Sequence, residues 1–388
     1  MRRLCTLLGM PQNRFASIHV VGTNGKTSVT RMTAALLEAH GVSTGAYLSP
    51  HIHSWRERVM IGGEPISEEA FVDALERTEQ AAEVADRAAG DEGPVTQFEL
   101  LTAAAFVAFA AARVQYAVIE AGLGGRLDAT NVIPSQLTVL TSVGLDHTEW
   151  LGETLEEIAR EKLAVLRDHT TLITGPLPPV VEPVVETMVE ERHAERRGQG
   201  PSDEAPQLYP GLNLSIATAV ATAVLGSIDR AKVAALEEVA IPGRAQLVRG
   251  DPDAIYDAAH NPDGAAALAR ALPLLDGREV VCCLAVLEGK DAAGIVGGLA
   301  PACSRFVCTE IPPDAIEGSG RPGGRARPAL ELAALCEKAG VDAEAVPDPV
   351  QAWARARELA RERNGVALAA GSHYLLSCIW TERPAQSS

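Results

Sequence analysis

A glycine-rich segment between an apolar run and a long helical stretch constrains the fold of this chain most strongly. Gly22-Thr23-Asn24-Gly25-Lys26-Thr27-Ser28 follows the apolar run Ser17–Val21 and opens the stretch Lys26–His40, which Gly41 closes. Glycines let a backbone approach phosphate closely, and the free N–H groups at a helix start point toward it. The order strand, loop, helix predicts a phosphate site, with Lys26 at the β- and γ-phosphates and a hydroxyl helping to hold magnesium.

The spacing of this loop differs from the common phosphate-loop pattern GxxxxGK[ST], because Val20 stands where the first glycine is expected. The alternative interpretation is a Gly-Asn turn followed by an ordinary helix cap. Even as a phosphate loop, the segment alone does not distinguish a ligase from a kinase or a nucleotide-dependent switch.

Apolar runs alternate with helical stretches along the whole chain, which predicts an α/β protein with parallel sheets covered by helices. A chain of 388 residues is long for one hydrophobic core, and Pro242-Gly243-Arg244 predicts a hinge between domains 1–241 and 242–388. In the first domain, strands are expected at Ser17–Val21, Thr44–Leu48, Gln115–Glu120 and Leu137–Val143, and helices at Lys26–His40 and Phe98–Arg113. In the second, strands are expected near Ile255 and at Glu279–Val286, Arg305–Cys308 and Val366–Ala369, and helices from Pro262, from Asp291, at Ala329–Ala339 and at Val350–Arg363.

The stretch Met188–Pro210 has mixed charges, glycine and proline, and it offers no apolar face to bury. This composition predicts a mobile surface loop.

The composition limits the partners of the chain. With 51 acidic against 34 basic residues, the formal charge of -17 repels nucleic acid and anionic membranes, so neither is a predicted partner. The sequence contains no apolar run long enough for a membrane span or a secretion signal. Its seven cysteines, including the adjacent pair Cys282-Cys283, show no zinc-ligand spacing and indicate reduced, mostly buried thiols in a cytoplasm.

Further polar side chains stand at the ends of predicted strands, where an open α/β sheet places its ligands. Ser49, Glu120 and His147 each follow or end such a strand, and Lys162 lies on the next helix. A carboxylate, a hydroxyl and an imidazole beside a triphosphate fit one or two magnesium ions. Taken singly, each residue fits a structural role better: Glu120 a helix cap, His147 a turn histidine and Lys162 a solvated helix residue.

Together these segments resemble a known family. The segments are GTNGKTS, Ser49-Pro50-His51, the run E-A-G-L-G-G-R-L-D-A-T-N at Glu120–Asn131, the run G-L-D-H-T-x-x-L-G at Gly144–Gly152, and Arg160-Glu161-Lys162. They are similar to those of folylpolyglutamate synthase/dihydrofolate synthase, a family of the Mur-ligase superfamily, and the similarity continues to Gly371-Ser372. The resemblance implies a P-loop-containing, Mur-ligase-like ATP-binding domain in 1–241 and a smaller, Rossmann-like α/β glutamate-ligase domain in 242–388.

The resemblance also implies roles for single residues. Asn24, Gly25, Lys26 and Thr27 would cradle ATP, and Asn213, Arg244, Asp257 and His260 would contact it from elsewhere in the chain. Ser49, Glu120 and His147 would ligate Mg²⁺, and Lys162 would carry an N-carbamate, a carbamylated lysine. Lys26, Lys162 and His147 would then be the catalytic side chains.

Two segments match those that contact dihydropteroate in the family. They are Thr96-Gln97-Phe98-Glu99 and Leu127-Asp128-Ala129. Their alternative interpretation is a helix start, with Thr96 as N-cap and Glu99 at the capping-box position, and a tight turn.

The activity implied by the resemblance is ATP-dependent ligation of L-glutamate to dihydropteroate or a reduced folate through an acyl phosphate, by a cytoplasmic monomer. One alternative is a Mur-type ligase that acts on another carboxylate, which the Gly124–Asn131 run disfavours. Another is a non-catalytic nucleotide-binding regulator, which would not need the carboxylate-activation residues Glu120, His147 and Lys162.

Overall fold

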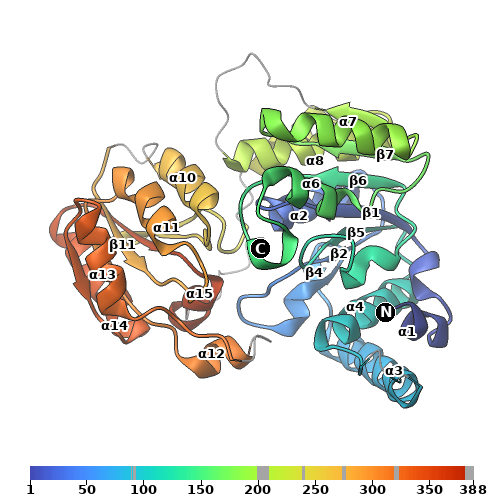
Figure 1. Ribbon diagram of the computed structural model, residues 1–388, viewed down its shortest axis with the longest axis horizontal. Coiled ribbons are helices and arrows are strands. Elements are labelled where there is room, and N and C mark those ends of the chain that lie inside the picture. Colours follow the sequence, from blue (N-terminus) through green and yellow to red (C-terminus); the bar gives the residue numbers. More distant parts are fainter. Residues whose placement is uncertain are drawn as a thin grey trace. The chain divides into compact units, whose positions relative to one another are not determined.

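The computed structural model describes residues 1–88, 90, 93–198, 209–237, 241–272, 277–318 and 323–380. The chain divides into two compact units. Unit 1 comprises Met1–Gln207 and Gly211–Val239, and unit 2 comprises Leu208–Pro210 and Ala240–Ser388. Each unit contains one sheet (Figure 1).

The sheet of unit 1 is parallel over most of its width. Its strand order is β4-β3-β2-β5-β1-β6-β7-β8, and only β3 and β4 run antiparallel to their neighbours. The strands are β1 (Ala16–Val21), β2 (Thr44–Tyr47), β3 (Val59–Ile61), β4 (Glu64–Pro65), β5 (Tyr116–Glu120), β6 (Leu137–Leu140), β7 (Thr171–Thr174) and β8 (Glu195–Gly198). Because β1 lies at the centre, the loop that follows it opens at the carboxyl edge between β5 and β6.

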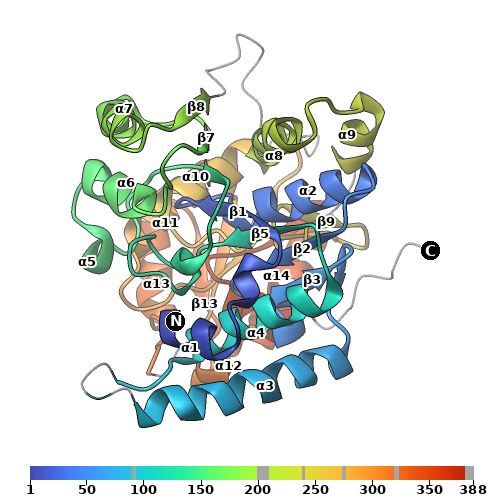
Figure 2. The same cartoon turned by 90° about the vertical axis from the view of Figure 1, so that its right-hand side faces the viewer.

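Helices cover both faces of this sheet. They are α1 (Arg2–Leu7), α2 (Lys26–Ala39), α3 (Glu68–Arg87), α4 (Gln97–Ala112), α5 (Thr148–Leu151), α6 (Leu155–Leu163), α7 (Glu182–Glu191), α8 (Tyr209–Leu225) and α9 (Arg230–Glu237). Figure 2 shows α2 on one side of β1, β5 and β2, with α4 on the other and α3 outside it. As its Ala-rich, apolar sequence predicts, α4 is buried on most sides, and its Phe106 and Phe109 pack in the core with Phe15.

Unit 2 has a second, mostly parallel sheet of order β13-β12-β11-β14-β10-β9, in which only β9 is antiparallel. The strands are β9 (Gln246–Val248), β10 (Asp253–Tyr256), β11 (Val280–Leu284), β12 (Arg305–Cys308), β13 (Ala343–Ala345) and β14 (Val366–Ala370). The helices are α10 (Pro262–Ala271), α11 (Ala292–Leu299), α12 (Pro313–Gly318), α13 (Ala329–Lys338), α14 (Pro349–Glu362) and α15 (His373–Ile379). Cys282 and Cys283 lie fully buried on β11, which confirms the prediction of buried free thiols there.

The prediction of a mobile loop over Met188–Pro210 is wrong at both of its ends. Met188 lies in α7, Glu195–Gly198 forms the edge strand β8, and Tyr209 begins α8. The strand was missed because it is highly charged; Arg196 pairs with Glu182 of α7, so the charges are used in pairing. The part of the prediction that concerns residues 199–208 lies outside the described residues.

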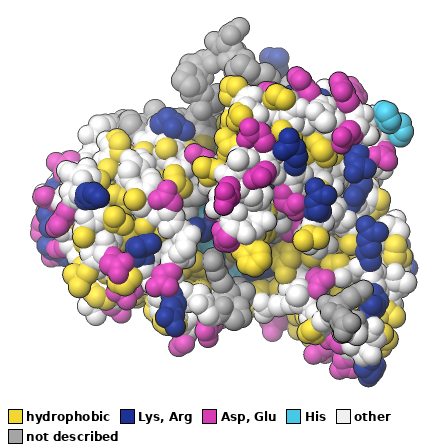
Figure 3. All heavy atoms as spheres, viewed as in Figure 1, with side chains coloured by type: hydrophobic (Ala, Val, Ile, Leu, Met, Phe, Trp, Pro, Cys, Tyr) yellow, Lys and Arg dark blue, Asp and Glu magenta, His cyan; other side chains and the backbone are white. Residues whose placement is uncertain are grey.

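Acidic and basic side chains are interspersed on the face shown in Figure 3. None of the helices in the described ranges combines the length and the apolar character needed to traverse a bilayer.

Candidate active site

The glycine-rich loop has a backbone that only glycine accommodates without strain. Gly25 is the N-cap of α2 at φ 85°, and a Cβ atom added to it would stand 2.6 Å from Oδ1 of Asn213. A Cβ on Gly22 would overlap the hydroxyl of Thr141. Asn213, predicted to contact ATP, therefore lies directly against the loop, on the buried side of α8.

The end of β6 holds the loop in place. The Thr141 hydroxyl donates to the carbonyl of Asn24 (2.6 Å), and the Ser142 hydroxyl accepts from the Asn24 N–H (2.9 Å). The Thr23 hydroxyl donates to the Gly144 carbonyl and accepts from the Gly144 N–H. These bonds tie Thr23 and Asn24 of the loop to three residues that follow the end of β6, and they restrict the conformations that the loop can adopt.

Two lysines meet at one carbonyl oxygen of this loop. Nζ of Lys26 and Nζ of Lys162 each lie 3.0 Å from the carbonyl oxygen of Gly22. Lys162 comes from α6 and is 3% exposed. Burial, and secondly the charge of Lys26, lower the pKa of Lys162 to about 7, although Asp146, Asp128 and Glu161 oppose the shift. Near neutral pH, a large fraction of the Lys162 side chain is therefore an uncharged amine.

Glu120 joins the phosphate loop to Ser49, another of the predicted strand-end residues. Its carboxylate, 1% exposed at the end of β5, accepts from the Thr27 hydroxyl at Oε1 (2.9 Å) and from the Ser49 N–H at Oε2 (3.1 Å). No cluster of three or more His, Cys, Asp or Glu side chains suited to a metal occurs in the described part of the chain. Mg²⁺ in nucleotide sites needs few protein ligands, because phosphates and water supply the rest. One carboxylate with adjacent hydroxyls fits that requirement.

His147 is the N-cap of α5, with a left-handed backbone at φ 51°. Its N–H donates to Oδ1 of Asp146 (2.9 Å), and its ring nitrogens lie 3.8 Å from Asp146 Oδ1 and 3.9 Å from Glu149 Oε1. The side chain is 27% exposed, which leaves it accessible to a ligand.

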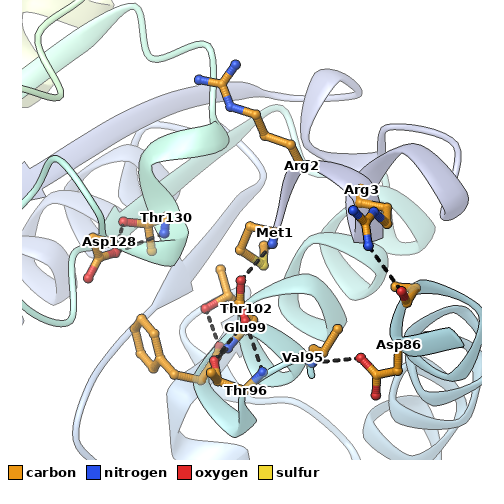
Figure 4. Close-up of polar contacts among 12 residues, drawn as sticks. Met1, Arg2, Arg3, Asp86, Val95, Thr96, Glu99, Thr102, Asp128 and Thr130 are labelled. Atoms are coloured by element: carbon orange, nitrogen blue, oxygen red, sulfur yellow. Dashed lines mark hydrogen bonds and ion pairs between the residues drawn. The ribbon is translucent and has the colours of Figure 1, made fainter. Parts of the chain in front are cut away.

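The first predicted acceptor segment does form a helix start. Thr96 caps α4, and Glu99 completes the capping box by accepting from the Thr96 N–H, while its other oxygen accepts from the amino group of Met1 at 2.7 Å (Figure 4). Although burial opposes it, the amino group of Met1 and the bonds from Thr96 hold the pKa of Glu99 below its ordinary value. Gln97 is exposed, and the Phe98 ring packs 6.1 Å from that of Tyr47.

The second predicted acceptor segment lies beside the first. A Cβ on Gly122 would stand 2.4 Å from the tip of the Phe98 ring, so the strand-end loop passes directly over that residue. Within the loop, Asp128 accepts from the Thr130 N–H at Oδ1 and from the Leu123 N–H at Oδ2. Leu127 is 91% exposed, and Ala129 is buried.

The same loop is clamped to the helix that carries Lys162. The Arg126 N–H donates to the Glu161 carbonyl, the Arg126 guanidinium pairs with the Glu161 carboxylate at 3.1 Å, and a Cβ on Gly125 would meet the carbonyl oxygens of Glu161 and Lys162 at 2.6 Å. The run Gly124–Asn131 therefore connects the predicted acceptor segment with Lys162.

In unit 2, the predicted site residue Asp257 forms several hydrogen bonds to its surroundings. Its carboxylate accepts from Ala245 N–H (2.6 Å), Ala259 N–H (2.7 Å) and the Tyr209 hydroxyl. Nδ1 of His260 lies 3.0 Å from the Ala258 carbonyl, and Arg244 is half-buried. By accepting the N–H of Ala245, Asp257 holds the loop that carries Arg244, a structural role that was not predicted from the sequence.

Thr141, Ser142 and Tyr209 are site residues that the sequence interpretation missed. The predicted strand Leu137–Val143 included Thr141 and Ser142, whereas β6 ends at Leu140 and leaves both hydroxyls at the strand end, beside the phosphate loop. Tyr209 carried no signal, because it lies at the end of the segment interpreted as a loop.

Comparison with known proteins places the fold in a class. Residues 20–174 match the Mur ligase middle domain, and residues 243–373 match the Mur ligase glutamate ligase domain. The chain therefore has the middle and C-terminal domains of a Mur ligase, as its two sheets and phosphate loop suggest.

Similar proteins show which family of Mur ligases the chain belongs to. The dihydrofolate synthase/folylpolyglutamate synthase of Mycobacterium tuberculosis is 36% identical over 87% of this chain and 76% of its own length. The structure of Mycobacterium tuberculosis folylpolyglutamate synthase complexed with ADP and AMPPCP superimposes with a TM-score of 0.87 at 31% identity, covering 97% of this chain and 93% of that one. That of Escherichia coli FolC in complex with DHPP and ADP gives 0.83 at 27% identity, covering 97% and 91%. The chain belongs to the dihydrofolate synthase/folylpolyglutamate synthase family.

Proposed function

We propose that the chain is an ATP-dependent ligase that joins L-glutamate to dihydropteroate, to reduced folates, or to both, through an acyl phosphate. The observation that carries the proposal is that Lys26 of α2 and Lys162 of α6 meet at the Gly22 carbonyl. Helix α6 in turn contacts Gly125 and Arg126 of the loop at residues 122–131, which we call the acceptor loop. This arrangement supports a phosphate site next to a site for the acceptor. The relatives crystallised with ADP, AMPPCP and DHPP support the same substrates.

The reaction requires activation because a carboxylate does not react with an amine at neutral pH. An oxygen of the acceptor carboxylate attacks the γ-phosphorus of ATP, the bond to the β,γ-bridging oxygen breaks, and ADP leaves. The amine of glutamate then attacks the acyl carbon, and inorganic phosphate leaves as the amide forms and the amine loses its proton. Both steps bring anions together, so placed cations do most of the catalytic work.

Lys26 is the cation that this chain supplies at the phosphates. Its ammonium lies within the loop, bonded to the carbonyls of Gly22 and Thr23. On nucleotide binding, the ammonium exchanges these partners for the transferred phosphoryl group. Asn24, Gly25 and Thr27 line the same loop, and Asn213 supports it from α8.

We propose two binding sites for Mg²⁺. Ser49 and Glu120 would hold one ion, and His147 with a carbamylated Lys162 would hold a second; a relative from Yersinia pestis was crystallised with AMPPNP and a Mn ion. When bound, the ions supply positive charge that offsets the phosphate and carboxylate oxygens. The lowered pKa of Lys162 favours carbamylation, because only the neutral amine adds CO₂.

The remaining assignments follow the resemblance. Arg244, Asp257 and His260 would contribute to ATP binding from unit 2. The pteroyl group would contact Thr96, Gln97, Phe98, Glu99, Leu127, Asp128 and Ala129. We also propose a cytoplasmic monomer that acts on small molecules, without nucleic acid or membrane, in keeping with its charge of -17.

Phosphate release from ATP tests the function. We expect release to require both glutamate and a pteroyl acceptor, because the acyl phosphate forms only on the acceptor and turns over only with the amine. Release that is equally fast without any acceptor would instead indicate a nucleotide hydrolase or switch.

A further inference from the structure

A histidine buried in the central strand has no role in the mechanism above. His19 lies on β1, three residues before Gly22, and is 0% exposed. Burial, and secondly the charge of Arg167, lower its pKa to about 3, so its imidazole is neutral at physiological pH. A buried polar ring in the middle of a parallel sheet is costly unless it is hydrogen-bonded, and Nδ1 of His19 has no hydrogen-bond partner among the described residues.

The hydrogen bonds of His19 lead to the acceptor loop. Nε2 lies 2.8 Å from the hydroxyl of Thr130, which is also fully buried. That hydroxyl donates its only proton to Oδ1 of Asp128 at 2.5 Å (Figure 4). It can therefore only accept from His19, which requires the tautomer with the proton on Nε2.

Asp128 is the centre of the loop. Besides the Thr130 hydroxyl, its carboxylate accepts the N–H of Thr130 and the N–H of Leu123, so it closes the turn from both sides. Leu127, next to it, is 91% exposed and therefore depends on this turn for its position. Rotation of the Thr130 hydroxyl would release one of the bonds that fix the Asp128 carboxylate.

We propose that His19 is a positioning residue for the acceptor, which donates from Nε2 to Thr130 and thereby holds Asp128 and Leu127 in the conformation that binds the pteroyl group. The inference rests on the proposed function, because it needs a pteroyl acceptor at this loop. It also ties the acceptor loop to the strand that carries the phosphate loop. Because His19 is fully buried, it acts through Thr130.

Substitutions test the proposal through the two Michaelis constants. His19→Leu removes the donor, and we expect the KM for dihydropteroate to rise about tenfold while the KM for ATP changes less than about twofold. His19→Gln keeps an N–H near the position of Nε2 and should recover most of the loss. Thr130→Val should act like His19→Leu, and the double variant should be no worse than either single variant.

Thr138→Val is the matched control. Thr138 lies on β6 directly opposite His19 of β1, and its hydroxyl has no hydrogen-bond partner among the described residues. Loss of the Thr138 hydroxyl perturbs the same buried region but removes none of the hydrogen bonds that join His19, Thr130 and Asp128. Both KM values should therefore stay unchanged.

Three results would overturn the inference: equal increases in both KM values, equal acceptor KM values for His19→Gln and His19→Leu, or additive effects in the double variant. Should His19→Leu not fold, nitrogen-15 NMR of the histidines in the wild-type protein decides. A neutral Nε2–H tautomer from about pH 5 to 9 supports the proposal, and an Nδ1–H tautomer refutes it. Wild-type protein that ligates glutamate to no pteroyl acceptor would instead refute the proposed function, and this inference with it.

Discussion

At the scale of single residues, the site depends on two lysines that share one carbonyl oxygen. Lys26 and Lys162 both bond to Gly22, yet they come from different helices and have different surroundings. Lys26 is half-buried at the start of α2, whereas Lys162 is buried at the end of α6. The same side chain can thus act as a cation in one place and as a neutral amine in the other.

Lys26→Ala should lower the ligation rate by at least about 100-fold, because the developing charge on the phosphoryl group loses its nearest cation. The fold should persist, since Lys26 is half-buried at the start of α2 and its ammonium bonds to the loop carbonyls of Gly22 and Thr23. Initial rates with circular dichroism measure both effects, and Lys338→Ala, on an exposed position of α13, is the control. Activity above about a tenth of wild type would contradict this role of Lys26.

The pKa of Lys162 predicts how stability depends on pH. Its folded-state pKa of about 7 lies below its ordinary value of 10.5. Between these values the unfolded chain binds the proton that the folded chain has lost, so the free energy of unfolding should rise as pH increases through this window. Urea denaturation at about pH 7 and 9, without bicarbonate, should show a rise in wild type that is smaller in Lys162→Met. An identical pH dependence in both proteins would contradict the shift.

Carbamylation of Lys162 is a separate prediction about the same amine. Bicarbonate near pH 8 should raise activity, and Lys162→Ala should be partly rescued by short carboxylic acids, which replace the anionic oxygens of the carbamate. A crystal grown with bicarbonate at that pH that shows an unmodified, well-ordered Lys162 would refute it.

At the scale of elements, the acceptor loop packs against α6 so closely that there is no room for a Cβ atom on Gly125. We expect Gly125→Ala to lower the free energy of unfolding by about 1–3 kcal/mol and to weaken acceptor binding, because its Cβ would collide with the carbonyls of Glu161 and Lys162. Gly297→Ala in α11, where a Cβ meets nothing within 4 Å, should be neutral or stabilising by up to about 1 kcal/mol. Equal denaturation midpoints for the two variants would show that the loop is free to move away from α6.

The elements that periodicity could predict were those with a clear apolar face. The strand at Arg305–Cys308 and the helices at Lys26–Ala39 and Ala329–Lys338 agree with the sequence interpretation to within a residue or so, because burial sets their pattern. Charged elements could not be predicted from an apolar pattern. Strand β8 is the example, since its Arg196 and Arg197 pair with glutamates.

The site could be predicted only where its residues follow strand ends. Glu120 and Ser49 meet as expected, because parallel strands bring their carboxyl ends to one edge. His19 and Thr130 were not predictable, because their contact joins positions 111 residues apart and neither stands at a strand end. Such contacts depend on the path of the loop.

At the scale of the whole molecule, the predicted ATP contacts are divided between the units. Lys26, Glu120 and Asn213 belong to unit 1, and Arg244 and Asp257 belong to unit 2. We expect a non-hydrolysable ATP analogue with acceptor to draw the units together, since closure would exclude water from the acyl phosphate. Small-angle scattering should show a smaller radius of gyration. An unchanged radius, with binding verified by calorimetry, would remove the closing step.

The central claim is that the protein forms an amide between glutamate and a pteroyl acceptor at the expense of ATP. The most direct measurement is the transfer of [14C]glutamate to dihydropteroate and, in parallel, to reduced folates, with and without ATP and Mg²⁺. We predict labelled product with at least one of these acceptors, only when ATP is present, with one ADP formed for each glutamate added. No labelled product with any pteroyl acceptor, from folded protein that binds ATP, would contradict the account.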